Sequence, residues 1–199
     1  MAGETTGTPI GDPTVLRAIA HPVRNRVLAE LYAAGPMRAA DVAEAIDVPA
    51  NQASFHLRQL AKYGLVEEAP ELARDGRDRV WRPVHEHGLN VSLDNLEQAP
   101  GGRAAVTVFR RQSIAHAQEF VARAFASSGG PDRHVMISDS SVRLTVDEAR
   151  QLGAELAELV EGWRGRTQGA STGERRTYEF IAILQPADPD PEDPSDARA

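Results

Sequence analysis

Between residues 50 and 63, hydrophobic and polar positions follow the period of a helix. Wound at about 100° per residue, the stretch places Ala53, Leu57 and Leu60 on one face, with His56 at its margin. The opposite face carries Asn51, Phe55, Arg58 and Lys62, flanked by Gln52, Ser54 and Gln59. The pattern predicts an amphipathic helix with one buried and one solvent-facing side.

Two further helix starts precede this stretch. Asp12 offers an N-cap with Pro13 at the first helical position, and Pro22 begins another helix directly after His21. Residues 37–66 are then predicted to form two short helices joined by a tight turn and followed at once by a strand. The second of these two helices is the amphipathic one.

A hairpin is predicted directly after the amphipathic helix. Residues 65–69 and 79–84 have the composition of two strands, and residues 74–78 between them are rich in turn formers. Arginines in such a wing can straddle a phosphate backbone or enter a minor groove. Two aspartates at the tip argue that internal ion pairs neutralise part of that charge.

The polar face of the amphipathic helix suits a duplex groove. It offers cations for phosphates, amides and hydroxyls for base edges and an apolar ring for a thymine methyl, without any acidic residue between Pro49 and Gly64. An ordinary surface helix has the same periodicity, but Phe55 places a large ring opposite the buried face, which favours a contact with a partner. The predicted DNA-binding residues are Arg38, Asn51, Gln52, Ser54, Phe55, His56, Arg58, Lys62, Arg74, Arg77 and Arg79.

Several motifs in this region carry a family resemblance. The matching positions are residues 16–24, which end in His-Pro-Val-Arg, and residues 40–43, 54–60 and 64–67. In order and spacing they resemble the winged helix-turn-helix of the ArsR-type bacterial transcriptional regulators. Asp47 departs from the family, whose turn usually has glycine there, and the cysteines of its metal sensors are absent. The resemblance implies a DNA-binding regulator, with repression as the expected mode.

The C-terminal half is predicted to be a small α+β unit. Two long helices are expected over residues 103–126 and 145–166, the second opened by a capping box at Thr145. Strands are expected over residues 134–144 and 177–184. Aromatic side chains in this half could line a pocket for a small-molecule effector of unknown identity, but their spacing predicts core residues first.

The first long helix of this half carries an apolar stripe wider than one neighbour requires. We therefore predict burial against a second copy of the chain as well as against its own domain, with a thick monomer core as the alternative. A homodimer also suits a palindromic operator, because its two recognition helices would lie about one duplex turn apart. The predicted dimerisation residues are Val106, Phe109, Ala117, Phe120, Val121 and Ala124.

Composition sets the outer bounds. The 199 residues, 41% of them hydrophobic, are enough for one medium or two small globular domains. The net charge of −7 is unevenly spread, because five acids and one arginine from Pro186 onward contribute −4 and the rest of the chain only −3. Groove binding depends on local charge, so this total does not exclude a DNA-binding protein.

Several classes of function lack their motifs. Without cysteine, disulfides and thiolate metal sites are impossible, and His85, Glu86 and His87 lack a second ligand cluster, so no metal or cofactor is predicted. The chain has no phosphate loop or nucleophile elbow, which argues against an enzyme. It also has no apolar run long enough to cross a bilayer, and we expect a cytoplasmic protein without a membrane partner.

The sequence thus predicts a mainly helical protein with small β elements. A winged helix-turn-helix domain is expected over residues 12–85, a linker over 86–102, a dimerisation or effector unit over 103–185, and a disordered acidic tail over 186–199. The expected function is regulation of transcription by a homodimer bound to double-stranded DNA, with residues 50–63 in the major groove and a wing at about residues 71–79. The alternative is a winged-helix protein-interaction module without direct DNA contact.

Overall fold

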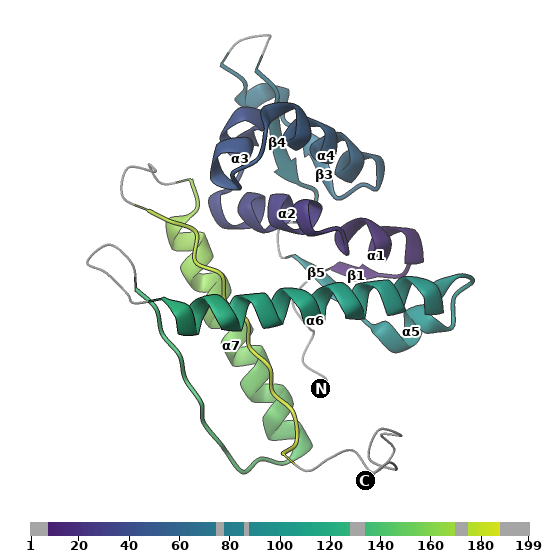
Figure 1. Cartoon of the computed structure of the whole chain (residues 1–199), viewed down its shortest axis with the longest axis vertical. Helices are drawn as coiled ribbons and strands as arrows, with labels where there is room; N and C mark the ends of the chain where they lie inside the picture. Colours follow the sequence, from purple (N-terminus) through teal and green to yellow (C-terminus); the bar gives the residue numbers. More distant parts are fainter. Residues whose placement is uncertain (1–7, 75–77, 86–87, 128–133, 170–174, 188–199) are drawn as a thin grey trace.

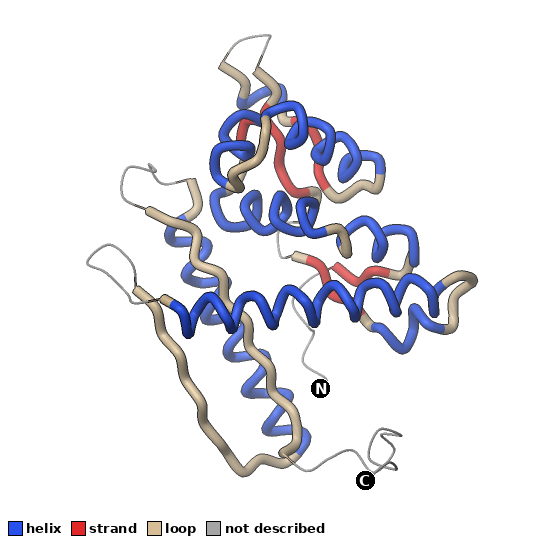
Figure 2. The backbone as a smooth tube through the Cα atoms, viewed as in Figure 1, coloured by secondary structure: helices blue, strands red, loops and turns tan. Residues whose placement is uncertain are grey.

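The computed structural model of this chain is mostly helical with small sheets (Figures 1 and 2). It describes residues 8–74, 78–85, 88–127, 134–169 and 175–187. None of the helices in these ranges combines the length and the apolar character needed to cross a membrane. The predicted acidic tail lies, from residue 188 onward, outside the described residues.

The predicted helix-turn-helix and hairpin are present in the N-terminal domain. In chain order its elements are α1 (Pro13–Ile19), α2 (Pro22–Ala34), β2 (Met37–Arg38), α3 (Ala39–Ala45), α4 (Ala50–Lys62), β3 (Val66–Glu68), the 3-10 helix η1 (Pro70–Leu72) and β4 (Val80–Pro83). The Asp12 carboxylate accepts a hydrogen bond from the backbone N–H of Thr14 at 2.7 Å, and Pro13 opens α1, as predicted. Pro22 likewise opens α2.

A three-stranded antiparallel sheet supports the helices, in the order β2-β4-β3. Met37 lies opposite Trp81, and Val66 lies opposite Pro83, so β4 is the central strand of the sheet. The core lies between this sheet and α1, α2, α3 and α4. Its fully buried members, all at 0% exposure, include Leu16, Val27, Leu31, Val42, Ala53, Leu57 and Leu60.

The predicted linker is instead part of the folded domain. It contains β5 (Leu89–Val91), which pairs in parallel with β1 (Thr8–Ile10), and α5 (Leu93–Glu97). Leu96 of α5 is buried, and a Cβ atom on Gly102 would lie 1.7 Å from the Leu96 carbonyl oxygen. Three-residue strands and a single buried leucine give too short a pattern to be visible as periodicity, which is why the prediction of a linker was wrong.

Both long C-terminal helices form as predicted. α6 (Gly102–Ala126) buries Ala105 and Val106 and packs along α1, as Figure 1 shows. α7 (Val146–Thr167) begins with the predicted capping box. Its Thr145 N–H donates to the Glu148 carboxylate at 2.7 Å, and the Glu148 N–H donates to the Thr145 hydroxyl at 3.2 Å.

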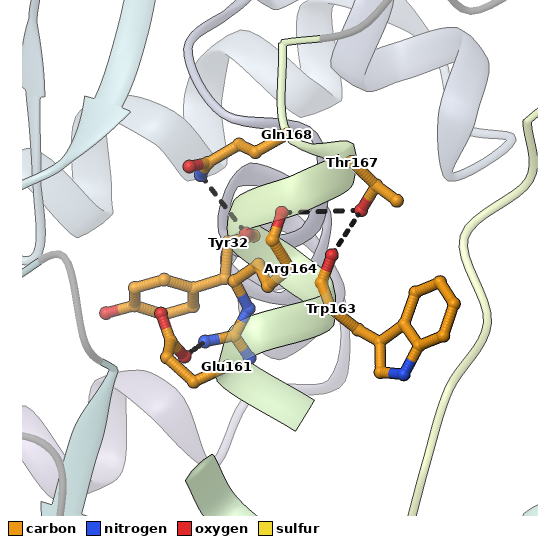
Figure 3. A network of polar contacts seen from close by, with 6 residues as sticks. All are labelled: Tyr32, Glu161, Trp163, Arg164, Thr167 and Gln168. Atoms are coloured by element: carbon orange, nitrogen blue, oxygen red, sulfur yellow. Dashed lines mark hydrogen bonds and ion pairs between the residues drawn. The ribbon is translucent and has the colours of Figure 1, made fainter. Parts of the chain in front are cut away.

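The C-terminal end of α7 is docked on α2 (Figure 3). Gln168 donates its side-chain amide to the Tyr32 carbonyl oxygen at 3.3 Å, and the Arg164 guanidinium lies 6.0 Å from the centre of the Tyr32 ring. Burial raises the pKa of Tyr32 to about 12. The Trp163 ring points away from this junction, and the Arg166 guanidinium stacks on it at 3.8 Å.

The predicted strands of the C-terminal half do not pair. Residues 134–144 and 175–187 run as extended loops on either side of α7 in the chain (Figure 2), and none of their described residues belongs to a β-ladder. Four of the six aromatic side chains predicted as core are exposed: Phe125 by 73%, Trp163 by 57%, Tyr178 by 61% and Phe180 by 56%. The other two, Phe109 and Phe120, are half-buried, and Phe109 packs against the core. The strands and the four exposed aromatics were predicted wrongly for the same physical reason, since no second layer in the described part of the chain covers these side chains or completes the sheet.

Candidate nucleic-acid interface

The amphipathic helix, α4, is seated as its periodicity predicts. Ala53, Leu57 and Leu60 are completely buried, and α4 packs against α2 and α3. The turn before it contains Asp47 at φ 51°, a left-handed conformation that Asp tolerates better than most residues. Arg26 of α2 donates to the Ile46 carbonyl oxygen in the same turn. The packing of its buried face and the contacts in the preceding turn therefore hold the helix in position.

The opposite face of α4 is open to solvent. Asn51, Gln52, Arg58 and Lys62 are exposed, and Phe55 is 49% exposed. Neither the guanidinium of Arg58 nor the ammonium of Lys62 forms an ion pair with any residue that the structure describes. The helix thus presents two uncommitted cations, two amides and one aromatic ring on a rigid support.

His56 does not belong to this open face, which corrects its prediction as a DNA contact. It is only 5% exposed, and its ring centre lies 4.8 Å from that of His21. Burial, followed by the charges of His21 and Arg24, lowers the pKa of His56. At 100° per residue, position 56 falls 60° from Ala53, at the border of the buried arc, and the packing of the domain decides that it is buried.

Arg38 has its charge engaged within the domain. Its Nε lies 2.8 Å from the Asp41 carboxylate, and its Nη1 lies 3.7 Å from that of Asp78. The hydrogen bond and the negative charge of Asp41 raise the pKa of Arg38 above its usual value. The three-residue spacing on one helix turn could have indicated the first pair, but only the fold brings Asp78 close.

Ion pairs at the base of the hairpin neutralise part of its positive charge. Arg79 lies 3.4 Å from Glu68, and Arg82 lies 2.8 Å from Glu67 and 2.7 Å from Glu71. All of these side chains are at least two-fifths exposed. Solvent-exposed pairs of this kind contribute only about 0–1 kcal/mol each, so a phosphate can compete with the carboxylates for the arginines.

The remaining predicted contact residues lie near the hairpin tip or beside the open helix face. Arg74 is exposed and Ser54 is half-buried. Arg77 lies in the segment 75–77, outside the described residues. The structure thus brings Asn51, Gln52, Phe55, Arg58 and Lys62 together on one helix face and leaves Arg74 and Arg79 in the hairpin, away from that helix.

The predicted dimerisation residues divide into two groups. Val106 is completely buried against the chain's own core, which corrects its assignment to a dimer surface, and Phe109 is partly buried beside it. Towards the end of α6 the surface opens, and Val121 is 51% exposed. The half-buried members of the set are Ala117, Phe120 and Ala124.

In the described parts of the chain, no three side chains of His, Cys, Asp or Glu are grouped to hold a metal ion. Of the histidine-rich cluster noted in the sequence, His85 is half-buried, whereas Glu86 and His87 lie outside the described residues. The rings of His21 and His56 do meet, and each of them leaves a buried Nδ1 without a hydrogen-bond partner among the residues that the structure describes.

Residues 19–69 match a family model described as a helix-turn-helix domain. This range contains α2, α3 and α4, the elements that position the open face. In such domains the second helix of the motif enters the major groove, so the match supports a DNA-binding transcription regulator. No curated protein matches the sequence.

Several solved structures resemble the chain weakly. The disulfide-formed AbfR is 14% identical, with 53% of this chain and 70% of that chain covered and a TM-score of 0.30. A MepR mutant from a multidrug-resistant S. aureus clinical isolate is 17% identical, with 72% and 78% covered and the same score. A second S. aureus MepR mutant, bound to an oligodeoxyribonucleotide, is 15% identical, with 75% and 87% covered and again 0.30. At these scores the likenesses are too weak to assign a function.

Proposed function

We propose that this chain is an ArsR-like transcription regulator that binds a specific double-stranded operator as a homodimer and represses transcription. The observation that carries the proposal is the two-sided character of α4. Its buried face fixes the helix, while its other face is exposed, free of acids and furnished with groups that bases and phosphates bind. Few other roles require that combination on one helix.

The order of residues along α4 suggests what each one contacts. Residues near the N-terminus of a recognition helix reach base edges, so the amides of Asn51 and Gln52 are suited to adenine and the ring of Phe55 to a thymine methyl. Arg58, one turn further on, is suited to guanine or to the backbone. Lys62, in the last turn, is suited to a phosphate as a mobile point charge.

The hairpin adds a second contact whose strength depends on exchange of partners. Arg79 leaves Glu68, and Arg82 leaves its two carboxylates, only if phosphates replace them. Each such exchange leaves a carboxylate without its arginine. It therefore releases fewer counterions overall than the binding of an unpaired arginine to a phosphate does. The salt dependence of operator binding should therefore be shallower than the number of basic residues at the interface suggests.

The test is selection of bound fragments from a random duplex library, followed by binding measurements with the selected site. We expect an inverted repeat, and Arg58→Ala should weaken its binding roughly 10- to 100-fold, the effect of about 1–3 kcal/mol expected for a base or phosphate contact. Arg111→Ala is the matched control, because Arg111 is exposed on α6 away from α4. Unchanged affinity of Arg58→Ala would reject the proposed face, and higher reporter expression without the protein would support repression.

A protein-interaction module is the second candidate, favoured by the exposed Phe55 ring and by the ion pairs that occupy Arg79 and Arg82. In that case Phe55 and its neighbours grip another protein and the chain does not shift a duplex. A stable protein partner lost on Phe55→Asp, together with no duplex binding at low salt, would favour this candidate over the first.

A further inference from the structure

The C-terminal half exposes far more apolar surface than a single chain usually tolerates. Of twenty large hydrophobic residues exposed in the described ranges, all but Phe55, Leu72 and Val84 lie from Val108 onward. Those seventeen, at roughly 100 Å² each, expose on the order of 1,700 Å² per chain, and large exposed apolar surfaces mark interaction sites. We expect a partner surface to bury these side chains.

Two extended segments contribute most of that surface. They are residues 134–144 and 175–187, which run in the same direction and opposite to α7 (Figure 1). Within the described chain neither segment makes a backbone–backbone hydrogen bond. Instead, side chains hold them: the His134 N–H donates to the Tyr178 hydroxyl at 3.3 Å, and Thr177 donates to Glu30 at 2.8 Å. The backbone edges of both segments are therefore available for pairing.

The second segment has the composition of an interior strand. Tyr178, Phe180 and Leu184 alternate on one face, and Ile181 and Ile183 lie on the other. A strand that is apolar on both faces belongs inside a covered sheet. Natural edge strands are protected by charges, proline or bulges, yet Glu179 is the single charged residue between positions 177 and 184.

We propose that a second copy of this chain completes this half, with residues 175–187 paired antiparallel to the same residues of that copy across a two-fold axis. The two copies form one intermolecular sheet that is covered by their α7 helices, and residues 134–144 extend it. The proposal rests on the homodimer in the function proposed above and names its interface. This interface differs from the dimer surface predicted on α6, because residues 175–187 and 134–144, not α6, supply the principal contact.

A second copy is favoured over a different protein for two reasons. The ten exposed large hydrophobic residues of the two segments, at roughly 100 Å² each, amount to about 2,000 Å² for two chains, at the lower end of the roughly 2,000–5,000 Å² of obligate homodimers. A strand edge is also self-complementary under a two-fold axis, which closes the assembly at two copies. The surface is continuous with α6, since Arg123 near the exposed end of that helix pairs with Glu179 at 2.8 Å.

The interface would set the spacing of the two recognition helices. The end of α7 is tied to α2 through Arg164, Gln168 and Tyr32, and α2 packs on α4 (Figure 3). A sheet shared between the copies thus fixes the position of each α7, and each α7 in turn fixes the position of α4 through α2. The pairing of residues 175–187 is in this way coupled to the spacing of the two recognition helices on the DNA.

The absence of cysteine allows a direct test by single substitutions from position 177 to position 184. Because each variant has one thiol per chain, any disulfide must join two copies. We expect oxidation to cross-link the full-length protein when the cysteine is at one of these positions or at its neighbours. The variants that cross-link should include Ala182→Cys or Phe180→Cys. Asn25→Cys, exposed on α2, is the matched control and should remain uncross-linked. Equal cross-linking of the control would overturn the proposal.

A second measurement uses Phe180→Asp combined with Ile183→Asp. Both side chains are exposed in the single chain, so its helix content should persist while the mass in solution falls from twice 21.5 kDa to 21.5 kDa. Amide protons of residues 177–184 should lose their protection from exchange at the same time. Leu72→Asp, at a similarly exposed leucine of the N-terminal domain, should leave the mass unchanged.

The outcomes separate this inference from the proposed function. A wild-type monomer, or a dimer that survives the double substitution, overturns the inference even if the operator is bound. A dimer that is lost on double substitution, with no duplex binding by the wild type, supports the interface and rejects the DNA-binding function. A wild-type assembly that contains another protein in place of the second copy also overturns the inference.

Discussion

The two halves of this molecule differ in how far their apolar side chains are buried. Every buried hydrophobic side chain in the described residues lies between Ile10 and Val106, and α7 has none at all. Yet both halves contain amphipathic helices with well-formed starts and an ample supply of apolar residues. The N-terminal half brings its apolar faces together within one chain, whereas the C-terminal half leaves them open.

Two leucines illustrate the difference. Leu57 of α4 is completely buried, and Leu159 of α7 is 57% exposed, although each lies on the apolar stripe of its helix. Periodicity tells which side chains share a face, but it does not tell whether anything packs on that face. Burial depends on a partner surface, and that surface need not belong to the same chain.

The largest expected effect concerns these same two positions. Leu57→Ala should destabilise the N-terminal domain by roughly 2–5 kcal/mol, because it removes buried methyl groups and leaves a cavity. Leu159→Ala should change the unfolding free energy of that domain by less than about 0.5 kcal/mol, as for an exposed substitution. Urea unfolding followed by fluorescence measures both. Equal losses would show that the two halves share one core and would remove the contrast.

Substitutions of two glycines test the same difference in packing between the two halves. Gly102→Ala should cost roughly 1–3 kcal/mol, since the new Cβ would lie 1.7 Å from the Leu96 carbonyl oxygen and the turn between α5 and α6 must shift. Gly153→Ala on α7 meets nothing within 4 Å and should instead stabilise its helix by up to about 1 kcal/mol. Thermal unfolding of the two variants should move in opposite directions.

A smaller effect is expected at the start of α7. Thr145→Ala removes the hydroxyl of the capping box and should cost about 1 kcal/mol of local helix stability. Thr145→Ser keeps the acceptor and should retain most of it. Hydrogen exchange in the first turn of α7 measures the loss. If the N-terminal domain lost the same protection, the two halves would unfold together rather than separately.

The smallest effect is expected from pH and is confined to the N-terminal half. Burial lowers the pKa of both His21 and His56 below the ordinary value of 6.5, so the unfolded chain binds more protons than the folded one as pH falls through 6.5. The unfolding free energy should therefore be highest above pH 6.5 and decline below it. The lowered pKa values of Asp12 and Asp41, ordinarily 3.8, act in a separate and more acidic window.

Urea unfolding at several pH values between 5 and 8 measures this decline. His56→Leu, which removes one member of the buried pair, should flatten the curve between pH 5 and 6.5. The exposed His116 on α6 provides the control, and His116→Gln should leave the slope unchanged. A flat curve for the wild type would contradict the lowered pKa values of His21 and His56.

Much of the fold and part of the candidate site were predictable from the sequence. The caps of α1 and α7, the start of α2, the hairpin and the buried face of α4 all follow from interactions within a few residues, and each is present. His56 was misplaced because its position on the helix lies near the border of the buried arc, where only the contact with His21 decides. Arg38 was predicted as a phosphate contact because the sequence does not show that Asp78 lies beside it.

What the sequence by itself determined was therefore local: helix periodicity, capping, turn chemistry and the acid-free face of α4, all encoded within about one or two turns of chain. What the tertiary structure decided was which of these faces meet. It paired β1 with β5, placed Leu96 under Gly102, engaged Arg38, Arg79 and Arg82 with carboxylates, and left residues 134–144 and 175–187 without a ladder. Contacts between distant segments depend on the packing of the whole chain, and no local pattern records them.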